Sequence, residues 1–232
     1  MSTTTLSQID VGGSVLFLGS GFSQGAINIA KKKLVTGRGL KTEFAQLLGV
    51  HPDTYDLKTL ADEVASRANL NLYQLLYNLF TVKELQRHQT EILRLQWMRI
   101  YTTNYDDAAE YGQYKNHVRA PSYSYDDVKP RKLARNSIIH LHGVIRKTTE
   151  NNVLQQLILN ESSYVRQHFE KSVWYDEFDR DLRFCSACFF LGYSLSDYHI
   201  TALLMQNPQV RAKTYFVTSD SPAPIFANRV EP

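Results

Sequence analysis

The sequence of 232 residues has little cysteine, no long apolar run and little excess charge of either sign. Two cysteines are too few for a disulfide scaffold, or for a zinc site whose four cysteine ligands all come from this chain. Apolar runs stay shorter than the roughly 18 residues that a membrane helix needs, so we expect no membrane contact. The opening MSTTTLSQIDVGG does not match a secretory signal. These features predict a cytoplasmic protein.

The charge balance also limits the function classes. There are 26 basic and 23 acidic side chains, a net charge of +3 with histidine neutral. This excess is too small to indicate nucleic acid, so we expect no direct sequence-specific binding of it. The basic cluster Lys31–Lys33 is interpreted as a solvated helix face. A hydrophobic share of 43% with 21% charged residues is typical of a globular protein.

Five short apolar runs alternate with longer stretches of helical spacing. The runs are rich in branched and aromatic side chains, which is typical of strands. We predict strands at 14–18, 98–103, 137–141, 185–191 and 214–218. The alternation predicts an α/β fold, with a Rossmann-like, open and mostly parallel sheet that has helices on both faces.

About eighty residues between the first two predicted strands show helical spacing and no strand signal. We interpret them as a helical insertion of about 40–96 within a single domain that spans 1–232. A long helix is predicted over 160–183, with Asn160 or Ser162 as its cap. Pro222 and Pro224 are interpreted as a break after the last strand.

Ligands of parallel sheets bind at the carboxyl edge, so the residues after each strand are the candidates for a site. After the first strand comes the glycine-rich run Gly19–Ser23. Its glycines allow close approach to a phosphate, or only a tight turn. Gln24 stands where the dinucleotide fingerprint has its third glycine, and no acidic residue ends a second strand at the required distance. This argues against a hydride-transfer dehydrogenase.

The second and third strands are followed by TNYDD and HLHG. Asn104 or Asp106 could cap the next helix, or the Asn104 amide could orient a ribose hydroxyl or a water. His140 and His142 are two apart, so they would share one face of a strand. They are interpreted as satisfied by backbone partners, with a metal pair disfavoured because no supporting ligand is present. His142, beside Gly143, is well placed as a general base.

The fourth strand is followed by Gly192–Asp197. Ser194 and Asp197 fit a capping box of the form S-x-x-D, and the same loop could be an anion or ribose site. Cys185 and Cys188 fall inside the predicted strand and are interpreted as buried core, so we expect no metal.

The loops GSGFS, TTNYD, HLHG and GYSLSD, each after an apolar strand and in this order, resemble the sirtuin-like superfamily in its minimal bacterial branch. The resemblance spans Ser14 to about Ser219. It implies that NAD+ is the substrate and that its phosphates lie on the first loop, where a serine replaces the usual alanine. The residues implied for this role are Gly19, Ser20, Gly21, Phe22 and Ser23.

The resemblance also assigns roles to the other loops. Asn104 and His142 match the catalytic asparagine and histidine, and Asp106 lies beside the nicotinamide pocket. Thr103 belongs with the residues that bind NAD+. Further matches, to the loop on the adenosine ribose side, are Gly192, Ser194 and Asp197.

Protein-deacylating sirtuins carry a four-cysteine zinc ribbon after the histidine motif, which this chain lacks. The pattern is more similar to the NAD-cleaving domains of bacterial antiphage systems. The implied function is an NAD+ glycohydrolase that forms nicotinamide and ADP-ribose and depletes NAD+ in abortive infection. Two alternatives stay open: a non-catalytic module that binds NAD+ or an ADP-ribose derivative, and a protein deacylase.

The implied partners are NAD+, further copies of the chain in a homo-oligomer, and a sensor or ATPase partner, fused or separate. The chain stops about a dozen residues after the last predicted strand. We therefore expect either a domain of a longer protein or a subunit that needs a partner.

Overall fold

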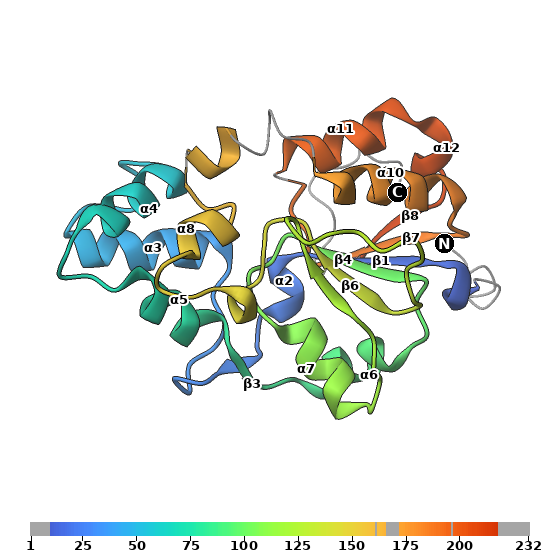
Figure 1. Ribbon diagram of the computed structural model, residues 1–232, viewed down its shortest axis with the longest axis horizontal. Coiled ribbons are helices and arrows are strands. Elements are labelled where there is room, and N and C mark those ends of the chain that lie inside the picture. Colours follow the sequence, from blue (N-terminus) through green and yellow to red (C-terminus); the bar gives the residue numbers. More distant parts are fainter. Residues whose placement is uncertain (1–9, 161, 166–171, 196, 218–232) are drawn as a thin grey trace.

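A six-stranded parallel sheet lies at the centre of the computed structural model, with helices on both faces (Figure 1). The strand order is β5-β6-β4-β1-β7-β8, which confirms the predicted α/β fold. The structure describes residues 10–160, 162–165, 172–195 and 197–217. The strands of this sheet are β1 (Val15–Leu18), β4 (Arg99–Thr102), β5 (Ser122–Ser124), β6 (Ser137–His140), β7 (Cys188–Leu191) and β8 (Thr214–Val217).

All five predicted strands are present, in shorter form. The fourth begins at Cys188, because Cys185 ends the preceding helix as its C-cap. Three strands were not predicted: β5, and the antiparallel pair β2 (Ile27–Asn28) and β3 (Val82–Glu84). Each has only two or three residues, and β5, at the edge of the sheet, reads Ser-Tyr-Ser. Short polar strands of this kind lack the apolar run on which the prediction depends.

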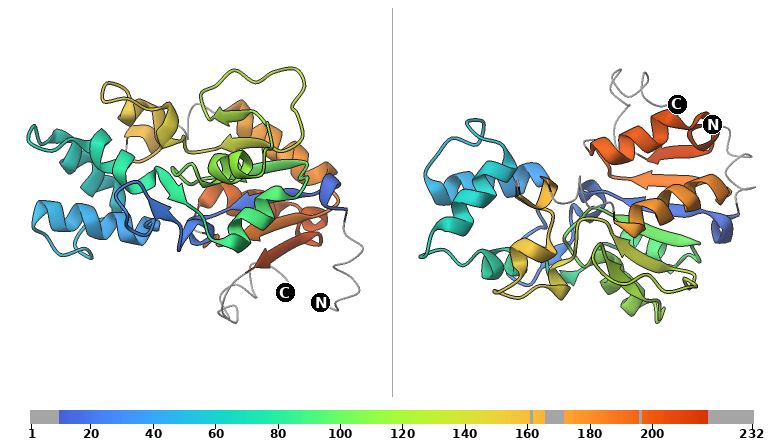
Figure 2. Two further views of the ribbon diagram at one scale, coloured as in Figure 1. Left: turned by 90° about the horizontal axis from the view of Figure 1, so that it is seen from below. Right: turned by 45° about the horizontal axis from the view of Figure 1, so that its top comes forward.

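The central strand β1 is buried on both faces, as its uniformly apolar sequence predicts. Val15 and Phe17 face one helical layer, and Leu16 and Leu18 face the other. The two layers lie on opposite sides of the sheet (Figure 2). The first layer consists of α10 (Val173–Phe184), α11 (Tyr198–Gln206) and α12 (Pro208–Arg211), and the second contains α6 (Arg87–Arg94) and α7 (Ala108–Lys115).

A separate helical unit lies to one side of the sheet and has its own apolar core (Figure 1). Within the predicted insertion of about 40–96, α6 packs on the sheet: its Leu93 belongs to the sheet core. The unit is completed by a later segment that the sequence reasoning left out. Its elements are α3 (Gly37–Leu48), α4 (Leu57–Ser66) and α5 (Leu72–Phe80), joined by η2 (Ile145–Lys147) and α8 (Val153–Gln156).

Side-chain caps explain where the helices of this unit begin. Thr36, Asp56 and Asn71 each accept a hydrogen bond from an amide in the first turn of α3, α4 and α5. Gly49 ends α3 with φ of 71°, the left-handed conformation that glycine adopts without strain. Two further short elements are η1 (Val11–Gly13) and α2 (Ser20–Ser23).

Two local predictions are wrong. A continuous helix over 160–183 is interrupted, because Ser172 has an extended backbone and caps α10 through the Trp174 amide. The cluster Lys31–Lys33 is exposed, but it lies in a turn beside β2 and not on a helix. Pro222 and Pro224 lie outside the described residues. Among the helices of the described ranges, none combines the length and apolar character that crossing a membrane requires.

Replacing Phe17 with alanine is expected to lower the free energy of unfolding by about 3–5 kcal/mol, because a fully buried ring is lost and a cavity remains. Phe17 is 0% exposed and packs on Phe178 and Phe190. The matched control is Phe184→Ala, since Phe184 is 81% exposed, and it should change stability by less than about 0.5 kcal/mol. Urea denaturation followed by circular dichroism measures both variants. Equal losses would contradict this core.

Candidate active site

A cavity of about 650 Å³ lies at the carboxyl edge of the sheet. Its volume is within the roughly 300–1,000 Å³ of ligand pockets. The loops after β1, β4, β6 and β7 form one wall, and α3, α4 and the end of α5 form the other. Seven of the predicted site residues line it: Ser20, Thr103, Asn104, Asp106, His142, Ser194 and Asp197.

The loop after β4 is held rigidly at the edge of this cavity. The Thr102 hydroxyl accepts a hydrogen bond from the Asn104 amide at 2.9 Å and donates one to the Leu18 carbonyl at 2.8 Å. The Tyr105 hydroxyl donates to the Ile158 carbonyl at 2.6 Å, which ties the loop to the segment after α8. These bonds fix the backbone from which Asn104 and Asp106 project.

Asn104, Asp106 and Ser23 form a buried polar group. Asn104 Nδ2 donates to Ser23 Oγ at 3.3 Å, and the Ser23 hydroxyl hydrogen-bonds to the Asp106 carboxylate. Asn104 is 8% exposed and its exposed part faces the cavity. Asp106 accepts a hydrogen bond from the amide of Ala108, the first residue of α7, at 3.1 Å. The N-cap of α7 is Asp107, however, so the expected cap at Asn104 or Asp106 is wrong. The Asn104 side chain therefore lines the cavity without capping a helix.

Burial dominates the electrostatics of this loop. It raises the pKa of Asp106 to about 6, although the Ser23 and Ala108 hydrogen bonds and the nearby His140 charge oppose the shift. Burial likewise raises the pKa of Asp107 to about 6, against the hydrogen bond from the Val82 amide. Two neighbouring carboxyl groups thus titrate close to physiological pH, which is typical of functional sites.

His142 is in direct contact with Asp197. Its Nε2 lies 2.9 Å from one carboxylate oxygen of Asp197 and 3.2 Å from the Tyr175 hydroxyl. The other oxygen of Asp197 caps α11 through the amides of His199 and Ile200, at 2.8 and 3.3 Å. Burial alone would raise the pKa of Asp197, but the contact with His142 and the two amide bonds hold it below its ordinary value.

This arrangement changes the interpretation of the fourth loop. The expected capping box at Ser194 is wrong, because Asp197 is itself the N-cap of α11. Ser194 is exposed and lines the cavity. Asp197, which the resemblance assigns to the adenosine ribose side, also lies against His142. Its contacts therefore connect it to the predicted catalytic histidine.

The glycines of the first loop make contact with another loop. A Cβ at Gly19 would lie 2.4 Å from the Gly192 carbonyl oxygen, and the Gly21 amide donates to that oxygen at 2.8 Å. Close backbone packing thus accounts for the glycines, whether or not phosphate binds nearby. Of the predicted phosphate residues Gly19–Ser23, Ser20 is the one that lines the cavity. Phe22 belongs to the sheet core.

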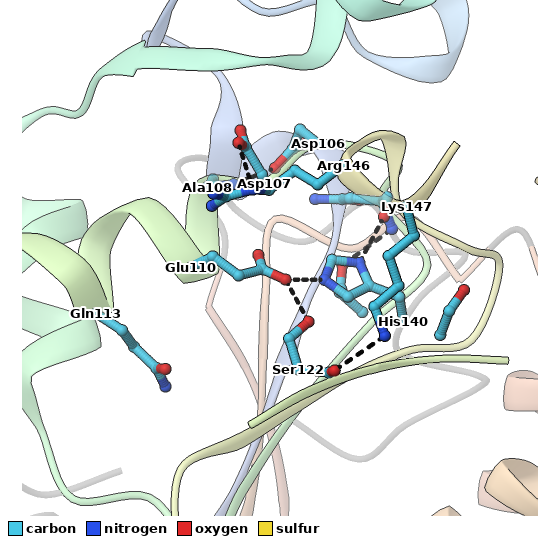
Figure 3. A network of polar contacts seen from close by, with 12 residues as sticks. Asp106, Asp107, Ala108, Glu110, Gln113, Ser122, His140, Arg146 and Lys147 are labelled. Atoms are coloured by element: carbon cyan, nitrogen blue, oxygen red, sulfur yellow. Dashed lines mark hydrogen bonds and ion pairs between the residues drawn. The ribbon is translucent and has the colours of Figure 1, made fainter. Parts of the chain in front are cut away.

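His140 and His142 do not share a face, so that expectation is wrong. Strand β6 ends at His140, and the following turn contains Gly143 with φ of 86°. His140 is fully buried and contacts Glu110 of α7, at 2.8 Å (Figure 3), while His142 lines the cavity. The expected backbone partner of His140 is present as the Asn104 carbonyl, at 3.2 Å.

Three further side chains near the cavity were not predicted. Lys58, from α4, lies with its Nζ 4.3 Å from the centre of the Tyr164 ring. The Tyr164 ring lies 5.9 Å from the ring of His142, edge to face. Lys58 and Tyr164 line the cavity, and Tyr175 contacts His142. They follow no strand, so their sequence carries no signal that would place them at the carboxyl edge.

The two cysteines are buried, as predicted. Burial raises the pKa of both Cys185 and Cys188, which disfavours the thiolate forms. Within the described ranges, no group of three or more His, Cys, Asp or Glu side chains has an arrangement that could hold a metal ion.

Comparison with known proteins gives one family. A model of the SIR2-like domain matches residues 98–229, more than half of the chain. The matched span includes Asn104, His142 and Asp197, whereas the glycine-rich loop precedes it. No curated protein matches the chain. The chain therefore belongs to the family of SIR2-like domains, and its function is sirtuin-like and related to NAD+.

Proposed function

We propose that the protein is an NAD+ glycohydrolase that cleaves the bond between nicotinamide and ribose. The observation that carries the proposal is one cavity that joins Asn104, Asp106 and the His142–Asp197 pair in a SIR2-like domain. An amide, a carboxyl group and a histidine with a carboxylate partner are the groups that this hydrolysis needs. The reaction converts NAD+ and water into nicotinamide, ADP-ribose and a proton.

In the proposed mechanism the bond between ribose C1′ and the nicotinamide nitrogen breaks first or in concert with water attack. The bonding electron pair goes to the pyridinium nitrogen, so nicotinamide leaves as a neutral molecule and needs no general acid. Positive charge develops on the ribose, as in other glycosyl transfers. Water then forms the new C1′–O bond and loses a proton. The protein has to orient the ribose and place the water.

His142 is proposed as the base that accepts this proton, directly or from a ribose hydroxyl. A proton on Nε2 faces the Asp197 carboxylate and leaves Nδ1 as the basic nitrogen. When Nδ1 takes a proton, the negative charge of Asp197 stabilises the imidazolium that forms. The cap that Asp197 makes on α11 keeps the carboxylate in place during this change.

Asn104 is proposed to hold the ribose and the attacking water, because its amide offers both a donor and an acceptor. Its bond to Ser23 orients the side chain toward the cavity. Asp106 is proposed to orient the nicotinamide carboxamide by accepting a hydrogen bond from its NH₂ group. The ionised form of Asp106 accepts this bond best, and its raised pKa makes that form dependent on pH near 6.

The resemblance also predicts a role in antiphage defence, a homo-oligomer and a sensor or ATPase partner. These three points remain predictions. The assays below therefore use the full chain with any partner encoded beside it. A non-catalytic module would instead show thermal stabilisation by NAD+ without turnover. A deacylase would transfer an acyl group from a supplied acyl-lysine peptide to ADP-ribose.

Asn104→Ala and His142→Ala are each expected to lower kcat for NAD+ cleavage by about 10²–10⁴-fold, because each removes a group that acts on the reacting atoms. Nicotinamide release measured by chromatography reports the rate. The matched control is His88→Ala, since His88 is an exposed histidine on α6, and it should keep the wild-type rate. Wild-type turnover that survives both active-site changes would contradict the assignment.

Asp197→Asn is expected to lower kcat by about 10²-fold or more, because the neutral amide no longer stabilises the imidazolium of His142. Asparagine is a good N-cap, so α11 should keep its start and the melting temperature should change little. A pH–rate profile and a thermal melt measure the two effects. A large loss of stability with an unchanged kcat would assign Asp197 to capping alone.

We propose that Lys58 binds a phosphate of NAD+ from the other wall of the cavity. Lys58→Ala is then expected to raise KM for NAD+ about tenfold, since a charge-assisted bond is lost, while kcat changes less than threefold. Lys58 contributes a positive charge to the wall formed by the helical unit. Lys83→Ala, an exposed lysine of β3, is the control. If KM stays at the wild-type value, Lys58 has no contact with the substrate.

A further inference from the structure

The loop after β4 carries Asn104 and is called the catalytic loop from here on. Behind it, His140 and Glu110 form a second histidine–carboxylate pair, in which the Glu110 side chain is 13% exposed (Figure 3). His140, at the end of β6, is 0% exposed. Its Nε2 lies 2.8 Å from Glu110 Oε1 on α7, and its Nδ1 lies 3.2 Å from the carbonyl oxygen of Asn104. The pair does not line the cavity, so it acts on a substrate only through the loop in front of it.

The neighbours of the ring decide its protonation state. A carbonyl and a carboxylate are both acceptors, so each ring nitrogen needs a proton, and a neutral histidine has only one. Ser122 Oγ donates to the same Glu110 oxygen at 2.5 Å, which fits a carboxylate. Glu110 Oε2 has no hydrogen-bond partner in the described part of the chain. A proton on Oε2 would therefore have no acceptor, which also favours the ionised form of Glu110.

The electrostatics agree with this geometry. Burial opposes charge on both groups, yet Glu110 raises the pKa of His140 above its ordinary value. In turn, His140 and the Ser122 hydrogen bond outweigh burial and lower the pKa of Glu110 to about 2. The pair is neutral as a whole, so it adds little field to a reaction that builds positive charge on the ribose.

We infer that Glu110 and His140 are positioning residues, a buried carboxylate–imidazolium pair that holds the Asn104 backbone through its carbonyl. The inference rests on the proposed function, because it assigns the pair a part in aligning Asn104 for NAD+ cleavage. A bond from the Nδ1 proton fixes the backbone from behind, while the Thr102 hydroxyl holds the Asn104 amide. A misplacement of about 1 Å at a reacting group can cost about 10²-fold in rate.

The test replaces the whole pair, because removing one partner would leave a buried charge and endanger folding. In Glu110→Met/His140→Phe, apolar side chains of similar volume fill the space and no donor faces the Asn104 carbonyl. We expect kcat for NAD+ to fall about 10²-fold, with KM within threefold of wild type. Glu110→Gln removes both charges of the pair and leaves no buried ion, because His140 can then be neutral with its proton on Nδ1 and accept from the glutamine amide at Nε2. Since Nδ1 still donates to the Asn104 carbonyl, this variant should recover at least tenfold of that loss.

The control is Glu177→Gln on α10. Glu177 is also buried and forms an ion pair, with Lys129 at 2.7 Å, but it does not contact the catalytic loop. It should keep the wild-type kcat. The positioning role is wrong if the double variant also keeps the wild-type kcat. It is also wrong if Glu177→Gln loses as much kcat as the double variant at an equal loss of stability.

A second measurement does not depend on turnover. Nitrogen NMR of labelled wild-type protein at neutral pH should show both ring nitrogens of His140 protonated, with the signal assigned by its loss in the double variant. The Asn104 and Tyr105 amides should exchange faster with solvent in that variant. A neutral His140 ring or unchanged exchange overturns the inference, whereas absent NAD+ turnover in wild type overturns the proposed function and leaves these readouts valid.

Discussion

The parallel pairing of β6, β4, β1 and β7 is the constraint on which the candidate site depends. Parallel strands in register end at the same edge, so the loops that follow them are forced together. At the centre, Gly19 and Gly21 pack on the backbone of Gly192, which leaves no room for a Cβ. This contact joins the loops after β1 and β7, where the order of the sheet reverses, and the cavity forms beside it.

The same constraint explains which parts of the site the sequence reveals. Asn104 and His142 follow buried apolar strands. The apolar composition of those strands is therefore enough to place both residues at the carboxyl edge of the sheet. Lys58 and Tyr164 lie in helical segments that line the cavity. The sequence of these segments does not indicate that they pack next to the carboxyl edge of the sheet. The partner of His142 was also missed, because the distance from Asp197 to that ring depends on how β7 and α11 pack and not on the local sequence.

For the fold as well, the sequence predicts the individual elements better than it predicts how they pack together. Apolar periodicity and caps such as Asp56 and Asn71 identify the helices of the inserted unit from the sequence alone. The unit is nevertheless completed by residues 145–159, about seventy residues further on. Its apolar helix faces have to pack on another segment, and the local sequence of the helices does not show which segment that is. For the same reason α6 was grouped with the insertion although Leu93 packs on the sheet. The local sequence thus determines where a helix forms, whereas the packing of its apolar face determines which part of the protein it contacts.

Two histidine–carboxylate pairs two residues apart show how burial separates chemical roles. Nε2 of His142 lies 2.9 Å from Asp197, and Nε2 of His140 lies 2.8 Å from Glu110. The first ring lines the cavity, and in the proposed mechanism its Nδ1 takes part in proton transfer. The second has an acceptor at each nitrogen and is 0% exposed, so loss of either ring proton would set a lone pair against the Asn104 carbonyl or the Glu110 carboxylate. One pair is therefore suited to exchange a proton, and the other to hold one.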